Sequence, residues 1–435
     1  MSDWTRLPGN QLFGLFSGTP PLFLLDNDSG DSLYLKVDDF NSTENSNGLR
    51  VALRSFSTSK NSTTRTFAPG VIVFPKRGAA IFLNRVQLLM KQATVDPNLM
   101  VLNVRPGFSP AWMRYELLRR GLSSICDNSS IPQINNKHLY PLTFDVPPLP
   151  EQRKIASILT TVDSLIEQTE VLIEKYRRVK QGMMADLLSR GVDSNGKLRP
   201  TQQQAPELYK QSELGWIPRE WDVKPIGTVA ESLVDGPFGS NLKTEHYVDQ
   251  DGVRVVRLQN INREGYDDSD KAFVSRRHAA TLARNKVVGG DVLIAGLGDE
   301  SNLVGRCCLY PGDLPPAINK ADCFRLRCLS TTMFNEFVSV VLNSTLLQPQ
   351  LRTVSQGVTR IRVNTGNLKK LVVPVPDLSE QLSICRRLNS IGDNIHAQLE
   401  VRAKLMIQKT GLMQDLLTGK VRVKVDKAEE VTTNV

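Results

Sequence analysis

The chain carries one stretch of 47 residues twice: VPPLPEQRKIASILTTVDSLIEQTEVLIEKYRRVKQGMMADLLSRGV at 146–192 and VPDLSEQLSICRRLNSIGDNIHAQLEVRAKLMIQKTGLMQDLLTGKV at 375–421. The two copies align without a gap at an offset of 229 residues, and 16 of the paired positions are identical. A repeat of this length describes architecture before it describes function. We therefore expect a duplicated molecule in which each half contains this stretch.

Each copy predicts one long helix. In the first copy apolar residues recur at spacings of three and four, the pattern of a coiled-coil seam, with Thr169 in the one polar core position. Prolines at 147, 148 and 150 prevent an earlier start, and Gly191 suits the end. About 40 residues of helix would span roughly 60 Å. The expected seam residues are Ile155, Ile158, Val162, Leu165, Leu172, Tyr176, Val179 and Met183.

The second copy has a less regular seam. Its expected seam residues are Ile384, Ile391, Val401, Leu405 and Leu412, interrupted by Arg387, Asn394, Gln398 and Gln408. A helix with an apolar stripe needs a partner, and the other copy in the same chain can supply it. We expect the two helices to pack together and to hold two other regions apart.

The composition favours a polyanionic partner, because the net charge is +9 and the pI is near 9.2. No apolar run is long enough to span a bilayer, and the N-terminus lacks the charged-then-apolar layout of a signal peptide. We therefore expect a cytoplasmic protein. The six cysteines and four histidines form no C-x2-C pair and no mixed cluster, so we expect no metal site.

The rest of the chain predicts two globular domains of mixed α/β (α+β) class. The first shows strand patterns at 33–37, 71–74, 80–83 and 99–104 and a helix pattern at 111–120. The second shows a glycine-rich turn at 235–242, strands at 253–261, 289–298 and 323–329, and a helix at 334–344. The expected divisions are a first domain at 1–145, a first long helix at 146–192, a linker at 193–213, a second domain at 214–374, a second long helix at 375–421 and a C-terminal tail at 422–435.

Both domains end with a short helix and a polar loop, which we call the first exit loop (123–141) and the second exit loop (355–371). Two stretches are basic and contain no acid. One spans 50–95 and the other spans 349–370, which includes Arg352, Arg360, Arg362, Lys369 and Lys370. Interleaved Ser, Thr, Asn and Gln add side chains that bind phosphates and base edges. A solvated surface is the alternative for each single residue. The basic residues of the first stretch are Arg50, Arg54, Lys60, Arg65, Lys76, Arg77, Arg85 and Lys91.

Catalytic motifs are missing from the sequence. There is no nucleophile elbow, HExxH, GxGxxG after a strand, or tetrapeptide of the kind that amino-methyltransferases use to hold a flipped base. Gly191-x4-Gly196-Lys197 is only a near match to a phosphate-binding loop, because Leu198 replaces the required Ser or Thr. A basic, duplicated chain without catalytic motifs indicates a recognition subunit.

The chain resembles the DNA specificity subunit of type I restriction-modification systems. The motifs that carry the resemblance are the domain ends VPPLPEQRKIASIL and VPVPDLSEQLSI, the helix ends KQGMMADLLSRGVDSNGKLR and KTGLMQDLLTGKVRV, and the segments LGWIPREWDV, DGPFGSNLK and GDVLIAGLG. The order of parts matches over essentially the whole chain. The first 110 or so residues match least, as expected where such subunits carry variable recognition domains.

The resemblance implies that each globular domain is a target recognition domain reading one half of a split DNA sequence. The long helices would form an antiparallel coiled coil that spaces the two half-sites. Two modification subunits, which carry S-adenosylmethionine, and two restriction subunits, which use ATP and Mg²⁺, would be the partners. This chain would supply specificity, with no cofactor and no catalytic residue of its own.

Charge, polarity and the resemblance together suggest a set of DNA-binding residues in each domain. Those of the first domain are Lys76, Arg77, Arg85 and Lys91, with Gln133, Asn135 and Lys137 in the first exit loop. Those of the second domain are Ser240, Asn241, Lys243, Arg257, Gln259 and Asn260, with Gln356, Thr359, Arg360 and Arg362 in the second exit loop. At the start of the long helices, Glu151, Gln152, Glu380 and Gln381 are expected to cap the helices.

Two other functions compete with recognition. A coiled-coil structural adaptor would hold protein partners and show no salt-dependent DNA binding, whereas recognition predicts a steep loss of binding with salt. A self-contained methyltransferase-nuclease would need a cofactor site, and the sequence contains no cofactor motif.

Overall fold

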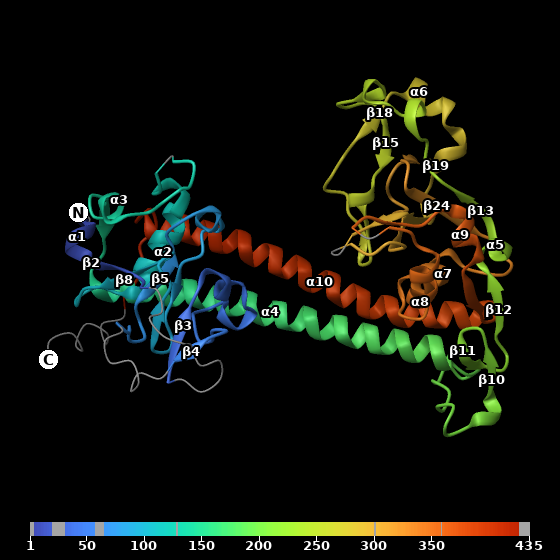
Figure 1. Ribbon diagram of the computed structural model, residues 1–435, viewed down its shortest axis with the longest axis horizontal. Coiled ribbons are helices and arrows are strands. Elements are labelled where there is room, and N and C mark those ends of the chain that lie inside the picture. Colours follow the sequence, from blue (N-terminus) through green and yellow to red (C-terminus); the bar gives the residue numbers. More distant parts are fainter. Residues whose placement is uncertain are drawn as a thin grey trace. The chain divides into compact units, whose positions relative to one another are not determined.

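The computed structural model describes residues 4–19, 31–56, 65–127, 129–299, 302–357 and 359–425. The chain divides into two compact units. Unit 1 comprises Met1–Leu172 with Gln398–Val435, and unit 2 comprises Ile173–Ala397. Each unit therefore contains one globular domain and one half of each long helix (Figure 1).

The two predicted long helices are confirmed as α4 (Leu149–Arg190) and α10 (Leu378–Leu417). The 42 residues of α4 correspond to about 63 Å. In unit 1, Asp163 pairs with Lys409, and Glu170 pairs with Arg402. Because the sequence number rises on one helix as it falls on the other, the helices are antiparallel. In unit 2, Leu187 and Leu188 of α4 share a core with Ile384 and Leu388 of α10.

The buried face of these helices differs from the predicted seam. Leu165, Val179 and Val401 are 43%, 46% and 41% exposed, whereas Asp163 is buried. The polar residues Arg387, Asn394 and Gln408 are exposed and do not interrupt an interface. The reason is that each helix half also packs against the domain of its own unit, which shifts the buried face away from a simple two-helix seam. Thr169 is buried as predicted, and its hydroxyl donates to the Leu165 carbonyl at 2.7 Å.

The domain of unit 1 is built on a four-stranded antiparallel sheet in the order β2-β8-β5-β6. Helix α2 (Pro110–Arg120) starts at Ser109, whose hydroxyl accepts from the Trp112 N–H, and buries Trp112 and Leu117 in the core beside this sheet. A second sheet, β4-β3-β7, contains the parallel pair β3–β7. The bounds are β2 Phe13–Ser17, β3 Ser32–Leu35, β4 Ser55–Phe56, β5 Ile72–Pro75, β6 Gln87–Leu88, β7 Ala93–Val95 and β8 Leu99–Val104.

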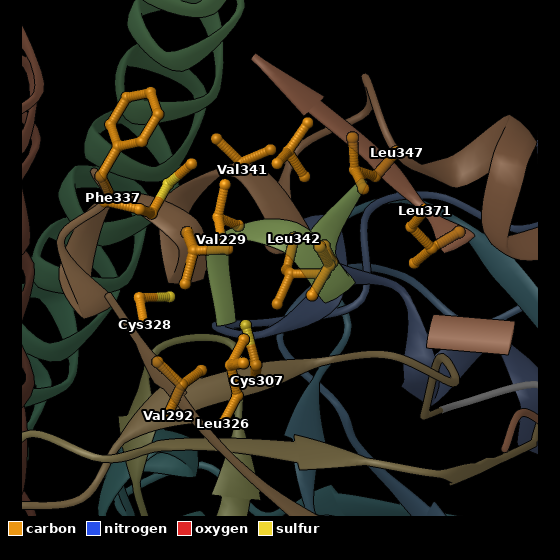
Figure 2. Close-up of a cluster of buried hydrophobic side chains, with 14 of the residues drawn as sticks. Val229, Val292, Cys307, Leu326, Cys328, Phe337, Val341, Leu342, Leu347 and Leu371 are labelled. Carbon is orange, nitrogen blue, oxygen red and sulfur yellow. The ribbon is translucent and has the colours of Figure 1, made fainter. Parts of the chain in front are cut away.

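The domain of unit 2 repeats this plan with a four-stranded sheet in the order β13-β24-β20-β22. Phe337, Val341 and Leu342 of α7 (Asn335–Asn343) pack with sheet residues such as Val292 and Leu326 (Figure 2). A second, five-stranded sheet runs β14-β18-β15-β23-β19 and again has a parallel pair, β15–β23. The bounds are β13 Ala230–Val234, β14 Tyr247–Val248, β15 Val253–Val256, β18 Phe273–Val274, β19 Lys286–Val287, β20 Val292–Ala295, β22 Cys307–Leu309, β23 Ala317–Asn319 and β24 Cys323–Cys328.

In both domains the first strand pairs with the last strand. β1 (Thr5–Pro8) runs antiparallel to β9 (Thr143–Val146), and β12 (Asp222–Pro225) runs antiparallel to β26 (Val372–Val375). The last strand then leads into the long helix. The shared topology confirms the mixed α/β fold class and the duplication that the repeat predicted. The short helices are α1 Gly9–Leu12, α3 Asn136–Leu139, α5 Ile226–Val229, α6 Arg276–Thr281, α8 Gln348–Val354 and α9 Thr365–Lys370.

Three local predictions are wrong. Residues 80–83 form part of a 3-10 helix, Ala79–Leu83, because Ile81 alone is buried while Phe82 and Leu83 are exposed. The strand expected at 253–261 ends at Val256, after which the chain turns through Leu258–Asn260. The expected linker at 193–213 ends in a strand, β10 (Tyr209–Ser212), which buries Tyr209 and forms a hairpin with β11 (Gly215–Pro218) at the start of the expected second domain.

The glutamines at the start of the long helices join each helix to its domain. The Gln152 side-chain carbonyl accepts from the Ser109 N–H at 2.8 Å, and the Gln381 side-chain carbonyl accepts from the Phe334 N–H at 2.9 Å. Ser109 and Phe334 precede the equivalent helices α2 and α7. These glutamines therefore fix the position of one domain helix in each unit rather than capping α4 and α10.

The neighbouring glutamates form a second matched contact. Glu151 accepts from the Trp4 indole and, through both oxygens, from the Arg422 guanidinium. Glu380 accepts from the Trp221 indole and from the Arg199 guanidinium in the same way. For Glu380 the capping expectation is wrong: Asp377 caps α10, since its carboxylate accepts from the Glu380 N–H at 2.9 Å.

Candidate nucleic-acid interface

The second exit loop is held as a strand beside the end of β20. β25 (Ile361–Arg362) pairs with β21 (Leu297–Gly298), and the buried Val363 donates its N–H to the Gly296 carbonyl at 2.9 Å. Gln356 and Arg362 exchange two backbone hydrogen bonds of 2.9 and 2.8 Å. This frame fixes the backbone and leaves the side chains of Gln356, Thr359, Arg360 and Arg362 exposed.

The first exit loop has the same frame in unit 1. The buried Ile134 donates its N–H to the Lys76 carbonyl at 2.8 Å, next to a bridge between Arg77 and Gln133. Ile134 and Val363 are separated by 229 residues, so the gapless repeat begins well before position 146. Sequence reasoning missed this extension, although the identities Asn135/Asn364 and Leu139/Leu368 carry it.

The predicted residues of the first domain have unequal access to a ligand. Arg77, Lys91 and Lys137 are exposed and have no ion-pair partner among the described residues. Lys76 is half-buried and donates to the Ser17 hydroxyl at 2.8 Å, and burial together with the nearby Arg77 charge lowers the pKa of its ammonium group. Lys60, from the same basic stretch, lies outside the described residues.

Arg85 and Asn135 have structural roles. The Arg85 guanidinium donates to the Phe40 carbonyl at 2.6 Å and to the Asn41 side chain, so it anchors the 3-10 helix Val37–Asn41. Asn135 starts α3, and its N–H donates to Nδ1 of His138 at 3.2 Å. The Asn135 side chain remains exposed.

Ser240, Asn241 and Lys243 lie exposed on the segment that follows the glycine-rich turn of the second domain. This turn is fixed by a close approach of two backbones. A Cβ added to Gly236 would lie 1.9 Å from the carbonyl carbon of Lys320, so the turn requires glycine there.

Asn260 does not belong to the candidate surface, which corrects the prediction. It is fully buried, and its amide donates to the Asp267 and Asp270 carbonyls at 2.8 and 2.9 Å. It shapes the turn after β15. The adjacent Arg257 forms an ion pair with Asp270, and the exposed Gln259 also donates to that carboxylate, so both are held in place near the surface.

Two carboxylates lie beside the second exit loop. Burial raises the pKa of Asp235 to about 6, although its Oδ1 accepts from the N–H groups of Gly236 and Asp322 at 2.7 and 3.0 Å. Asp322 pairs with Arg362 at 2.9 Å. The loop is therefore a place where acidic and basic side chains meet at the edge of the protein.

The variant Asp235→Asn should gain stability relative to wild type as the pH rises. Because the folded-state pKa is raised, the wild-type carboxyl contributes most below about pH 4, and that contribution is lost as the pH rises through about 6. Discounted for partial solvent exposure, the variant should be about 1 kcal/mol more stable at pH 7.5 and nearly equal at pH 4. Urea unfolding at both pH values measures the difference in stability between the variant and wild type. An equal difference at pH 4 and pH 7.5 would contradict the raised pKa of Asp235.

Within the described ranges, no group of three or more His, Cys, Asp or Glu side chains could hold a metal ion. No helix in the described part of the chain is long and apolar enough to cross a membrane.

Comparison with known proteins identifies the fold and the family. A 316-residue alignment with the MjaVIII type I restriction enzyme specificity subunit of Methanocaldococcus jannaschii is 27% identical and covers 70% of this chain and 68% of that relative. The EcoBI specificity subunit of Escherichia coli is 24% identical over 66% of this chain and 60% of its own length. The crystal structure of the type I S subunit from M. genitalium superposes with a TM-score of 0.55 at 16% identity, covering 95% of this chain and 96% of that one.

The family described as type I restriction modification DNA specificity domain matches residues 103–175 and 218–405, which is more than half of the chain. The matched residues include both exit loops and the starts of both long helices. The chain therefore belongs to the family of type I restriction-modification DNA specificity subunits.

Proposed function

We propose that the chain reads a bipartite DNA target, with one half-site contacted by each domain, and directs modification and restriction to it. The observation that carries this proposal is the repeated exit-loop frame. In both domains a buried apolar residue pins the loop to the sheet, while polar and cationic side chains beside it stay exposed. A rigid backbone with projecting Arg, Gln and Thr is suited to reading base edges.

The exposed cations outside the frame support the same function. Arg77, Lys91 and Lys137 of unit 1 and Lys243 of unit 2 can contact phosphates, which would position the DNA without reading its sequence. Family membership favours this recognition function over a coiled-coil adaptor or a self-contained methyltransferase-nuclease.

The partners are part of the proposal. Two modification subunits would bring S-adenosylmethionine and the adenine chemistry, and two restriction subunits would bring ATP- and Mg²⁺-dependent translocation and cleavage. Apolar side chains exposed on the long helices, such as Leu165 and Val401, offer contact area to such subunits. This chain would contribute the choice of sequence.

Genome-wide adenine methylation, measured by single-molecule sequencing in cells with and without this gene, tests the proposal. The expected result is a split motif with a fixed gap that appears only with the gene. No difference, in cells where the modification subunit is shown to be expressed, would refute recognition.

The double variant of Arg360→Ala and Arg362→Ala should methylate its target at least tenfold more slowly. Both side chains are exposed, and Arg360 pairs with no other described residue, so their loss removes contacts to DNA and leaves the core intact. The initial rate of methyl transfer to a duplex target by the purified complex is the measurement. An unchanged rate would exclude the second exit loop from the interface.

A further inference from the structure

One position of the shared frame carries a different side chain in each domain. Gln133 and Arg362 both lie one residue before the buried anchor, Ile134 or Val363. Each of them also pairs with a residue that lies just after an equivalent strand. Gln133 forms a bridge with Arg77, which follows β5, and Arg362 pairs with Leu297, which follows β20. The fold therefore presents the same backbone position twice, once with an amide and once with a guanidinium.

Arg362 is oriented by a carboxylate that is itself fixed. Its Nη2 lies 2.9 Å from Oδ2 of Asp322, whose side chain is only 16% exposed against 58% for Arg362. Asp322 adopts a left-handed conformation with φ of 63°, donates its N–H to the Asp235 carboxylate, and accepts from the Gly296 N–H through its backbone carbonyl at 2.7 Å. Gly296 also accepts from the Val363 N–H, so the backbone of Asp322 and the exit loop are held by the same residue.

This arrangement suits a base edge better than a phosphate. A guanidinium has five N–H donors, and the contact with Asp322 leaves the others available for a bidentate contact. A carboxylate placed next to a phosphate would repel it, which makes Asp322 a poor neighbour for a contact to the DNA backbone. An arginine that is held by a carboxylate and projects from a rigid strand matches the bidentate reading of guanine O6 and N7.

We propose that Arg362 is a specificity-determining residue that reads a guanine in the half-site of the second domain, with Asp322 as its positioning residue. Gln133 is its counterpart, and glutamine is the side chain that pairs in the same way with adenine. The position 133/362 thus helps to make the two half-sites different. This inference rests on the proposed function, because it assigns a base to a domain that reads DNA.

The test is the methylated motif of cells that express the modification subunit with wild-type chain or with Arg362→Gln, Arg362→Lys or Asp322→Ala. In Arg362→Gln we expect one guanine of one half-site to lose its preference and methylation of the original motif to fall roughly tenfold, while the other half-site and the gap stay unchanged. Arg362→Lys should also lose guanine preference, because lysine keeps the charge and lacks the planar fork. Asp322→Ala should weaken the same preference and no other.

Arg219→Gln is the charge-matched control, since this exposed arginine lies outside the frame, and its motif should equal that of wild type.

Two results would overturn the inference. The first is a uniform fall in methylation by Arg362→Gln, with every position of the motif unchanged, together with a near wild-type methylation level and motif in Arg362→Lys. This result would identify a phosphate contact. Normal levels and an unchanged motif in both variants would exclude any DNA contact. If a variant methylates too little to define a motif, the purified complex can be tested on duplexes that carry each of the four bases at the guanine position. Equal discrimination between these bases by wild type and Arg362→Lys would also overturn the inference. Failure of the wild-type chain to give a split motif would instead refute the proposed function.

Discussion

Glu380→Ala should destabilise unit 2 by about 3–5 kcal/mol, because it removes one member of a buried ion pair and takes the carboxylate away from the hydrogen-bond donors around it. The Glu380 side chain is only 4% exposed, and it accepts hydrogen bonds from the Val192 N–H at 2.7 Å and the Trp221 indole at 2.9 Å as well as from Arg199. Arg199 is 10% exposed and would keep its contacts with the exposed Glu220 and with the Arg190 carbonyl. Urea unfolding of the full chain, with hydrogen exchange of peptides spanning 190–221, measures the loss and locates it.

The matched control is Glu151→Ala, which removes the equivalent carboxylate in unit 1. Its arginine partner, Arg422, is 41% exposed, so water can replace the lost contact, and we expect a cost of about 1–2 kcal/mol. Exchange should then rise around the start of α4 instead of around 190–221. An equal cost for the two variants would show that burial of the arginine does not decide the effect.

Asp163→Asn should destabilise unit 1 by about 3 kcal/mol at pH 7, since it removes the carboxylate that pairs with both Lys409 and Arg114. The Asp163 carboxylate lies 2.6 Å from Nζ of Lys409 and 3.4 Å from Nη1 of Arg114, and it accepts from the Tyr115 hydroxyl at 2.7 Å. Burial opposes its ionisation, but Lys409, Tyr115 and Arg114 outweigh burial and hold the pKa of the carboxyl below its usual range.

The pH dependence of this variant follows from the same pKa. Because the folded-state pKa is depressed, the stability that Asp163 contributes is present above the unfolded value near 4 and is lost as the pH falls through the folded value. The difference between wild type and Asp163→Asn should therefore shrink below pH 4. Glu170→Gln is the control, because its pair with Arg402 is exposed on both sides and should contribute less than about 1 kcal/mol. A difference that does not change between pH 7 and pH 3 would contradict the charge argument.

Local pattern decided much of the fold. The long helices, the strand at 99–104 and the helix α2 could be predicted because apolar spacing, proline and capping residues act within a few positions of one another. The 3-10 helix Ala79–Leu83 could not, because four consecutive apolar or small residues do not tell whether one or all of them will be buried. The prediction of the coiled-coil seam was wrong for a related reason. The pattern shows which residues are apolar, but it does not show that each helix half will pack against a globular domain as well as against the other helix.

The candidate site shows the same division. Composition indicated the exposed cations of the second exit loop, since the acid-free basic stretch 349–370 is visible in the sequence alone. It could not distinguish Asn260, which is buried in a turn, from Gln259, which is exposed beside it. Both are polar residues next to a strand, and only the packing of the neighbouring loop separates their roles.

By itself, the sequence determined that the molecule is duplicated, that each half contains a long helix and a mixed α/β domain, and that the second exit loop is basic. These properties depend on periodicity, repetition and charge, which are local or additive. Only the tertiary structure decided that Glu380 binds Val192, Arg199 and Trp221, which lie 159 to 188 residues away in the chain, and that Gln133 and Arg362 occupy one equivalent position. The physical reason is that hydrogen bonds and ion pairs depend on distance in space, and the fold sets these distances between residues remote in sequence.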